Sequence, residues 1–129
     1  MLESLEISTI LPSNSQEAYL AWLDSREHTE FTGQEASIDP RIGGEITAYS
    51  GYYKGEIQDL EPYKRIAMSW RTTDFLEDQK DSSLEVLFAD TKEGLEMTLV
   101  QTDIPEGQSK IYEDKWHKYY FEPMKRYFE

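Results

Sequence analysis

The chain of 129 residues contains no cysteine, which excludes a disulfide framework, a thiolate metal site and a cysteine nucleophile. It has only two histidines, His28 and His117, which stand far apart, so no paired-histidine zinc motif is present. No apolar run approaches the ~18 residues needed to cross a bilayer. The chain does not open with the basic and apolar segments of a signal peptide. These absences predict a cytoplasmic protein without membrane insertion, resident metal or cofactor.

Basic side chains are also scarce: 13 Lys and Arg face 26 Asp and Glu, which gives a formal net charge of −13. This excess of negative charge disfavours nucleic acid and anionic lipid as partners. The imbalance is uneven, because residues 109–129 hold five basic and four acidic side chains. Two interpretations stay open for that segment. It is either the solvated back of a helix, or a surface attracted to the acidic body or to a partner.

Aromatic residues, in contrast, make up 13% of the chain, a share that argues against disorder. The length fits one hydrophobic core, and we predict a single domain over residues 1–129. Residues 2–11 alternate like a half-buried strand, and 15–23 and 25–31 have helical signals. From 35 to 102 the pattern is that of about six further strands separated by turns. With a helix from about Ser109 to the end, the order predicts an α+β fold with an antiparallel sheet of about seven strands.

The C-terminal helix is expected to be strongly amphipathic. At 100° per residue, Tyr112, Trp116, Tyr119 and Tyr120 fall on one face. Pro123 lies on the same face, well inside the helix. Because proline has no N–H to donate, it should kink or loosen the helix there.

This aromatic face suggests a ligand cavity between the helix and the sheet. Buried Tyr and Trp need partners for their O–H and N–H groups, which water or a ligand in a cavity would supply. The alternative is that the rings simply fill the core. The predicted cavity lining comprises Trp22, Phe31, Met68, Trp70, Tyr112, Trp116, Tyr119 and Tyr120.

Few residues suggest catalysis. Glu56 is a candidate polar group of the cavity if its strand turns it inward, with structural pairing as the alternative. His28 and His117 are interpreted as surface histidines, although a general base at either position stays open. No nucleophile stands beside them, so no catalytic residue and no metal ligand is assigned.

A set of short motifs in a fixed order resembles a known family. The motifs are Thr32-Gly33, Ala36, Ile38-Asp39-Pro40-Arg41, Gly43-Gly44, Gly51, Gly55-Glu56-Ile57, Leu60-Glu61-Pro62, Arg65-Ile66, Ser69-Trp70-Arg71 and Trp116-His117-Lys118-Tyr119-Tyr120-Phe121-Glu122. Together they resemble the START-like (polyketide-cyclase/birch-pollen-allergen) superfamily, in the branch similar to the C-terminal domain of the activator of heat-shock protein 90 ATPase. The resemblance implies a helix-grip fold, in which the sheet curls around the long C-terminal helix and two short helices follow the first strand.

Three functions remain open after this resemblance. The superfamily's cavity often holds an apolar molecule, so we expect binding of an apolar or aromatic small molecule. The co-chaperone of this branch uses its similar domain to help stimulate a chaperone's ATPase, which implies a chaperone or other protein partner as the alternative. A cyclase- or hydrolase-like enzyme is the second alternative, for which the sequence offers no recognisable catalytic constellation.

Overall fold

The computed structural model describes residues 1–129. Strand β1 (Glu3–Leu11) is followed by two short helices, α1 (Ser15–Leu23) and α2 (Ser25–Thr32). Six strands follow, namely β2 (Ser37–Ile38), β3 (Glu45–Ala48), β4 (Tyr53–Glu61), β5 (Arg65–Thr72), β6 (Ser82–Thr91) and β7 (Gly94–Ile104). The chain ends in one helical segment, made of α3 (Ser109–Trp116), the π-helical turn η1 (His117–Phe121) and α4 (Glu122–Tyr127).

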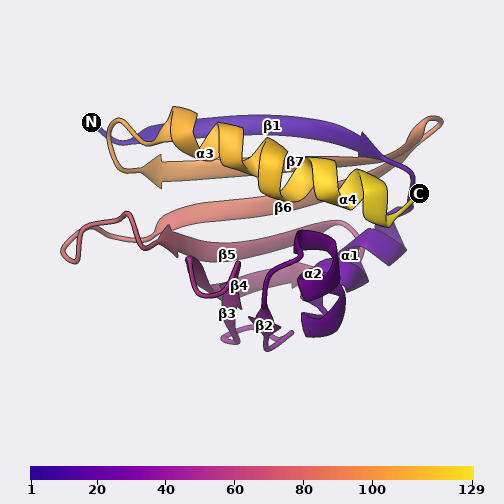
Figure 1. The fold of residues 1–129 in the computed structure, drawn as a ribbon, viewed down its shortest axis with the longest axis horizontal. Helices are drawn as coiled ribbons and strands as arrows, with labels where there is room; N and C mark the ends of the chain where they lie inside the picture. Colours follow the sequence, from indigo (N-terminus) through magenta and orange to yellow (C-terminus); the bar gives the residue numbers. More distant parts are fainter.

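All seven strands form one antiparallel sheet in the order β1-β7-β6-β5-β4-β3-β2. The C-terminal helical segment runs across one face of this sheet, and α1 and α2 pack at one end (Figure 1). The predicted α+β class, the seven strands and the two short helices after the first strand are confirmed. None of the helices is long and apolar enough to span a membrane.

Local sequence signals explain where the short helices begin and end. The side chain of Asp24 accepts a hydrogen bond of 2.9 Å from the backbone N–H of Glu27, which caps the N-terminus of α2. Gly33 follows the last residue of α2 with a φ of 77°, a left-handed conformation that glycine adopts without strain. The two helices are therefore separated by a single residue, and both are held against the same end of the sheet.

The helix near Pro123 is loosened, as predicted, and the structure shows how. The backbone N–H of Glu122 bonds the carbonyl of His117, five residues earlier, which is the π-helical pattern. Pro123, which cannot donate, sits at the start of α4 directly after this turn. A π turn advances each residue by a smaller angle than an α turn. Both Tyr120 and Phe121 therefore face the sheet and are buried.

The core lies between the sheet and the helical segment. It contains 30 buried apolar residues from every element of the sheet and from all the helices, so the elements share one core. Alternate residues of β4 illustrate the pattern, since Tyr53, Gly55 and Ile57 are buried while Lys54 and Glu56 are exposed. This alternation decides which strand residues can take part in an internal site.

Candidate functional site

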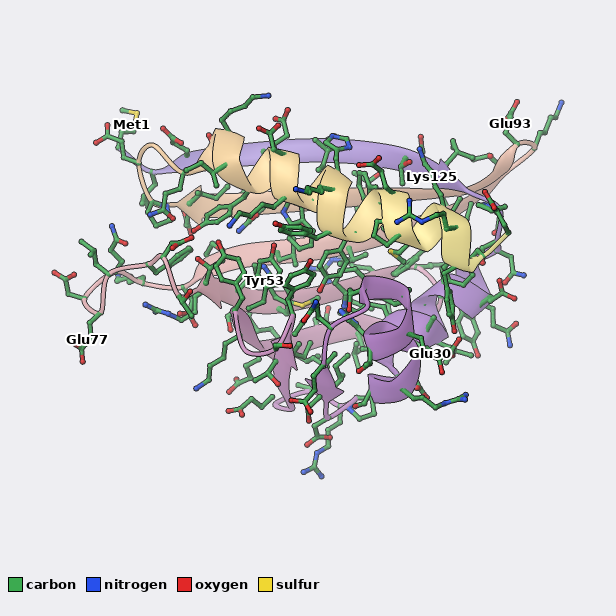
Figure 2. All side chains as sticks on the ribbon, in the orientation of Figure 1. Met1, Glu30, Tyr53, Glu77, Glu93 and Lys125 are labelled. Atoms are coloured by element: carbon green, nitrogen blue, oxygen red, sulfur yellow. The ribbon has the colours of Figure 1, made fainter.

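The strongest candidate site is a group of stacked side chains inside the core. We call it the aromatic cluster, and it consists of Trp22, His28, Phe31, Tyr53, Trp70, Trp116 and Tyr120. Helices α1 and α2, strands β4 and β5, and the C-terminal helical segment contribute to it. Tyr53 is labelled near the middle of Figure 2, below the C-terminal helical segment in this view. Every member is less than 3% exposed, so the cluster is sealed from solvent.

One half of the cluster is a stack of three rings. The Tyr53 ring lies 5.1 Å from Trp70 and 5.9 Å from Trp116, and it is nearly parallel to Trp116 at 5°. Trp70 and Trp116 are 5.7 Å apart. Gly55 helps to seat this stack, because a Cβ there would collide with the Ser69 carbonyl and come within 3.4 Å of Trp70.

The other half of the cluster is built around a buried histidine. His28 is fully buried, with its ring 5.0 Å from Trp22 and 4.6 Å from Phe31. Its Nδ1 is 2.8 Å from the backbone carbonyl of Trp22, and its Nε2 is 2.8 Å from the hydroxyl of Tyr120. The interpretation of His28 as a surface histidine is wrong.

The hydrogen bonds of His28 define its protonation. A carbonyl oxygen can only accept, so Nδ1 carries the proton and donates to Trp22. In the neutral ring Nε2 must then accept, so Tyr120 donates its hydroxyl proton to His28. Burial disfavours the charged ring and lowers the pKa of His28 to about 4. Burial also raises the pKa of Tyr120 well above its ordinary value, so both members of this pair are neutral near pH 7.

Some polar atoms of the core have partners within the protein. The indole N–H of Trp116 donates to Gln101 Oε1 at 3.0 Å, and Gln101 Nε2 donates to Ser82 Oγ at 3.0 Å. The hydroxyl of Tyr112 is 2.8 Å from Thr72 Oγ1. These bonds satisfy N–H and O–H groups for which a ligand or water was the predicted partner.

Two buried donors have no partner. The indole nitrogens of Trp22 and Trp70 are enclosed and have no acceptor within hydrogen-bonding distance. An unsatisfied buried donor costs about 1–3 kcal/mol. These two N–H groups are the feature of the cluster that packing alone does not explain.

The structure brings together five of the eight predicted cavity residues in the aromatic cluster: Trp22, Phe31, Trp70, Trp116 and Tyr120. Met68 is fully buried on β5 and belongs to the same core. Tyr112 and Tyr119 lie elsewhere. Tyr112 packs 6.1 Å from Phe75, and half-buried Tyr119 stacks 4.6 Å from Tyr49.

Glu56, a candidate polar group of the cavity only if its strand turned it inward, does not face the interior. Glu56 is exposed on the outer face of the sheet, since its neighbours Gly55 and Ile57 are the buried residues of β4. There it lines a polar groove of about 650 Å³ together with Lys54 and Arg71. The run Gly55-Glu56-Ile57 is compatible with either facing, and only the pairing of β4 with β3 and β5 decides it.

Sequence reasoning missed three buried rings at or beside the site, His28, Tyr53 and Phe121. At 100° per residue, Phe121 would lie about 140° from Trp116 on the helix, away from the sheet. The π turn moves it to the buried side. Tyr53 carried a usable signal, because it shares the parity of Gly55 and Ile57 on β4.

The space between helix and sheet is filled by these rings. The structure has five surface pockets, and none of them is lined by Trp22, Trp70, Trp116 or Tyr120. A cleft of about 380 Å³ between α2 and α4 approaches the cluster at Phe31 and Tyr127. No group of three or more His, Asp or Glu side chains is arranged to hold a metal ion. The predicted ligand cavity is closed in this structure, and ligand binding stays a prediction.

A seven-stranded antiparallel sheet packed around a C-terminal helix, with two short helices after the first strand, defines a helix-grip, START-like protein. Within that class, the sequence profile described as "Activator of Hsp90 ATPase homolog 1-like protein" matches residues 13–129. The chain therefore belongs to this family.

Individual relatives agree with the assignment. The mouse protein "Activator of 90 kDa heat shock protein ATPase homolog 1" is 28% identical over 116 residues, which cover 90% of this chain and 34% of the mouse protein. The human homologue is 27% identical over 116 residues, with the same coverage of 90% and 34%. The chain thus spans about a third of the length of these relatives.

Solved structures show the same fold. A heat-shock protein 90 activator from Plasmodium falciparum superposes with a TM-score of 0.83 at 23% identity, covering 92% of this chain and 91% of that one. A protein from Micromonospora echinospora superposes with a TM-score of 0.81 at 21% identity, covering 98% and 76% of the two chains. At this identity the likeness establishes the fold alone.

Proposed function

We propose that this chain is a protein-interaction module that acts on a chaperone of the 90 kDa heat shock class. The family match over residues 13–129 carries the proposal, because the curated relatives are named as activators of that chaperone's ATPase. The filled core supports it, since recognition then falls to the surface. Action by this segment alone, and the cytoplasmic location predicted from the sequence, are parts of the proposal.

A binding experiment with the full chain tests this function. Titrating it into the purified chaperone of its own source should give saturable association at micromolar concentration, and a rise in ATP hydrolysis. An equally acidic folded protein of similar size is the control, because a net charge of −13 alone could attract basic patches. Absence of association at tens of micromolar would contradict the proposal.

A second candidate function is binding of an apolar or aromatic small molecule with a hydrogen-bond acceptor. The specific observation behind it is the pair of unpartnered indole N–H groups, on Trp22 and Trp70. A ligand that separates the rings would give these donors an acceptor and keep an apolar surround. The cleft beside Phe31 and the π turn at His117–Phe121 offer a route for that opening. The enzyme alternative has no such support, since both ring nitrogens of His28 are already hydrogen-bonded.

Native mass spectrometry and a thermal-shift screen of apolar ligands test the second candidate. A ligand that binds only the folded state, at 100 times its Kd, should stabilise the protein by about 2.7 kcal/mol. Trp70→Phe keeps a ring but removes one unpartnered donor. This substitution should reduce the rise in unfolding temperature given by ligands with a hydrogen-bond acceptor. It should leave the rise given by pure hydrocarbons unchanged. A clean apo mass and no shift across the panel would count against ligand binding.

A further inference from the structure

A surface groove lies beside α1. A groove of about 550 Å³ is lined by Tyr19, Leu20, Leu23, Asp24, Glu27, Pro40 and Leu60. We call it the α1 groove. Leu20 is 46% exposed there, although it sits in the middle of a well-formed helix. An apolar groove open to solvent is a typical feature of a binding surface.

The turn beside the groove is conformationally costly. Pro62, Tyr63 and Lys64 join β4 to β5, and the N–H of Lys64 donates to the carbonyl of Glu61 at 2.9 Å. Tyr63 has a φ of 64°, in the left-handed region where glycine or asparagine is favoured. Its ring nevertheless stays 41% exposed, 5.5 Å from Tyr19 and edge-on to it. This strain holds an exposed aromatic side chain next to the groove, as is common at binding sites.

The charge of the α1 groove has one sign. Asp24 and Glu27 line it, and no lysine or arginine does. Both carboxylates also make structural contacts, since Asp24 caps α2 and Glu27 accepts the hydroxyl proton of Tyr127 at 2.7 Å. The groove therefore combines apolar walls with an acidic rim.

Basic groups near the groove are mostly paired. Arg26 pairs with Glu30, and Arg41 pairs with Asp39. Arg65 is shared by three carboxylates, those of Asp59, Glu61 and Glu85. Lys64 forms no ion pair. Its single positive charge is small beside the net charge of the chain, which is −13. The charged side chains that line the groove are therefore two carboxylates, Asp24 and Glu27, that form no ion pair with a basic group.

We propose that the α1 groove docks a partner-protein segment whose apolar side chains are flanked by lysine or arginine. Leu20, Leu23 and Tyr63 would contact the apolar side chains, and Asp24 and Glu27 would face the basic ones. The proposal rests on the proposed function in taking the recognised molecule to be a protein. Its test does not require the chaperone, so the two can fail separately.

The probe is an amphipathic helical peptide of about 18 residues with leucines on one face and lysines on the other. In an NMR titration of the full chain, amide shifts should concentrate at the α1 groove and at Tyr63. Leu20→Ser should weaken binding about tenfold, as expected for loss of one buried apolar anchor. Glu27→Gln should lower the affinity and reduce its dependence on salt between about 50 and 500 mM.

Matched variants separate the groove from general attraction to an acidic protein. Leu76→Ser removes another exposed leucine, 64% exposed and remote in sequence, and should leave the affinity unchanged. Glu6→Gln removes an exposed charge on β1 and should leave the affinity for the peptide nearly unchanged. Shifts spread over the acidic surface, equal losses for Leu20→Ser and Leu76→Ser, or equal binding of a peptide with glutamates in place of its lysines would each overturn the proposal.

Discussion

Replacing Trp116 by alanine is expected to lower the free energy of unfolding by about 4 kcal/mol. Trp116 is 1% exposed and lies within 6 Å of Tyr53, Trp70 and Tyr120, so its removal leaves a cavity in the middle of the core. The loss also leaves Gln101 Oε1 without the donor that satisfies it. Urea unfolding followed by circular dichroism measures the effect.

Two variants show whether the stack is responsible. Trp116→Phe keeps a ring but loses the N–H to Gln101, and should cost about 1–2 kcal/mol. Tyr119→Ala removes a half-buried ring three residues further along the chain, and should cost about 1 kcal/mol. If Trp116→Ala costs no more than Tyr119→Ala, the aromatic cluster is not the centre of the fold's stability.

Lowering the pH from 6.5 to 4 is expected to destabilise the protein by about 3 kcal/mol through His28. Burial lowers the pKa of His28 to about 4 in the folded state, against an ordinary value of 6.5. Above pH 6.5 the ring is neutral in both states and contributes no pH dependence. Between 6.5 and 4 the unfolded chain binds a proton that the folded chain does not. Stability therefore falls as the pH falls through this interval, and this contribution levels off below it.

Urea unfolding at pH 7, 6 and 5 measures the upper part of this fall, which reaches about 2 kcal/mol at pH 5. This window lies above the ordinary pKa values of carboxyl groups. Half-buried Glu3 titrates lower still, because hydrogen bonds from the backbone N–H groups of Gly107 and Ser109 lower its pKa to about 2. His28→Gln removes the titrating imidazole. The free energy of unfolding should then change little with pH across this window, whatever the substitution costs in stability at pH 7. An equal slope in wild type and His28→Gln would assign the pH dependence to other groups.

The arrangement of strands and helices follows closely from local pattern. Period-two alternation indicates β1 and the strands from β3 onward, and Asp24 and Gly33 mark both ends of α2. These signals are reliable because each depends on neighbours in the sequence, such as a capping carboxylate next to free backbone N–H groups. The resemblance then supplies what local pattern lacks, namely that the sheet packs around the last helix.

The contents of the core were harder to predict. His28 lies in the polar stretch Ser25–Thr32, and no local feature distinguishes it from an exposed histidine. Its burial depends on Tyr120, which is 92 residues away and donates the hydrogen bond that makes a buried imidazole tolerable. The facing of Glu56 stayed open for the same reason, because it depends on the pairing of β4 with two other strands.

The sequence by itself determined the fold class, the order of the elements and the aromatic, amphipathic character of the last helix, because these depend on local periodicity and capping. Only the tertiary structure decided which polar groups are buried, which side of β4 faces inward, and that the π turn before Pro123 places both Tyr120 and Phe121 in the core. It also decided that the rings close over the space between helix and sheet. These outcomes depend on contacts between residues that are far apart in the sequence, because such contacts set the packing density and supply the hydrogen-bond partners of buried groups.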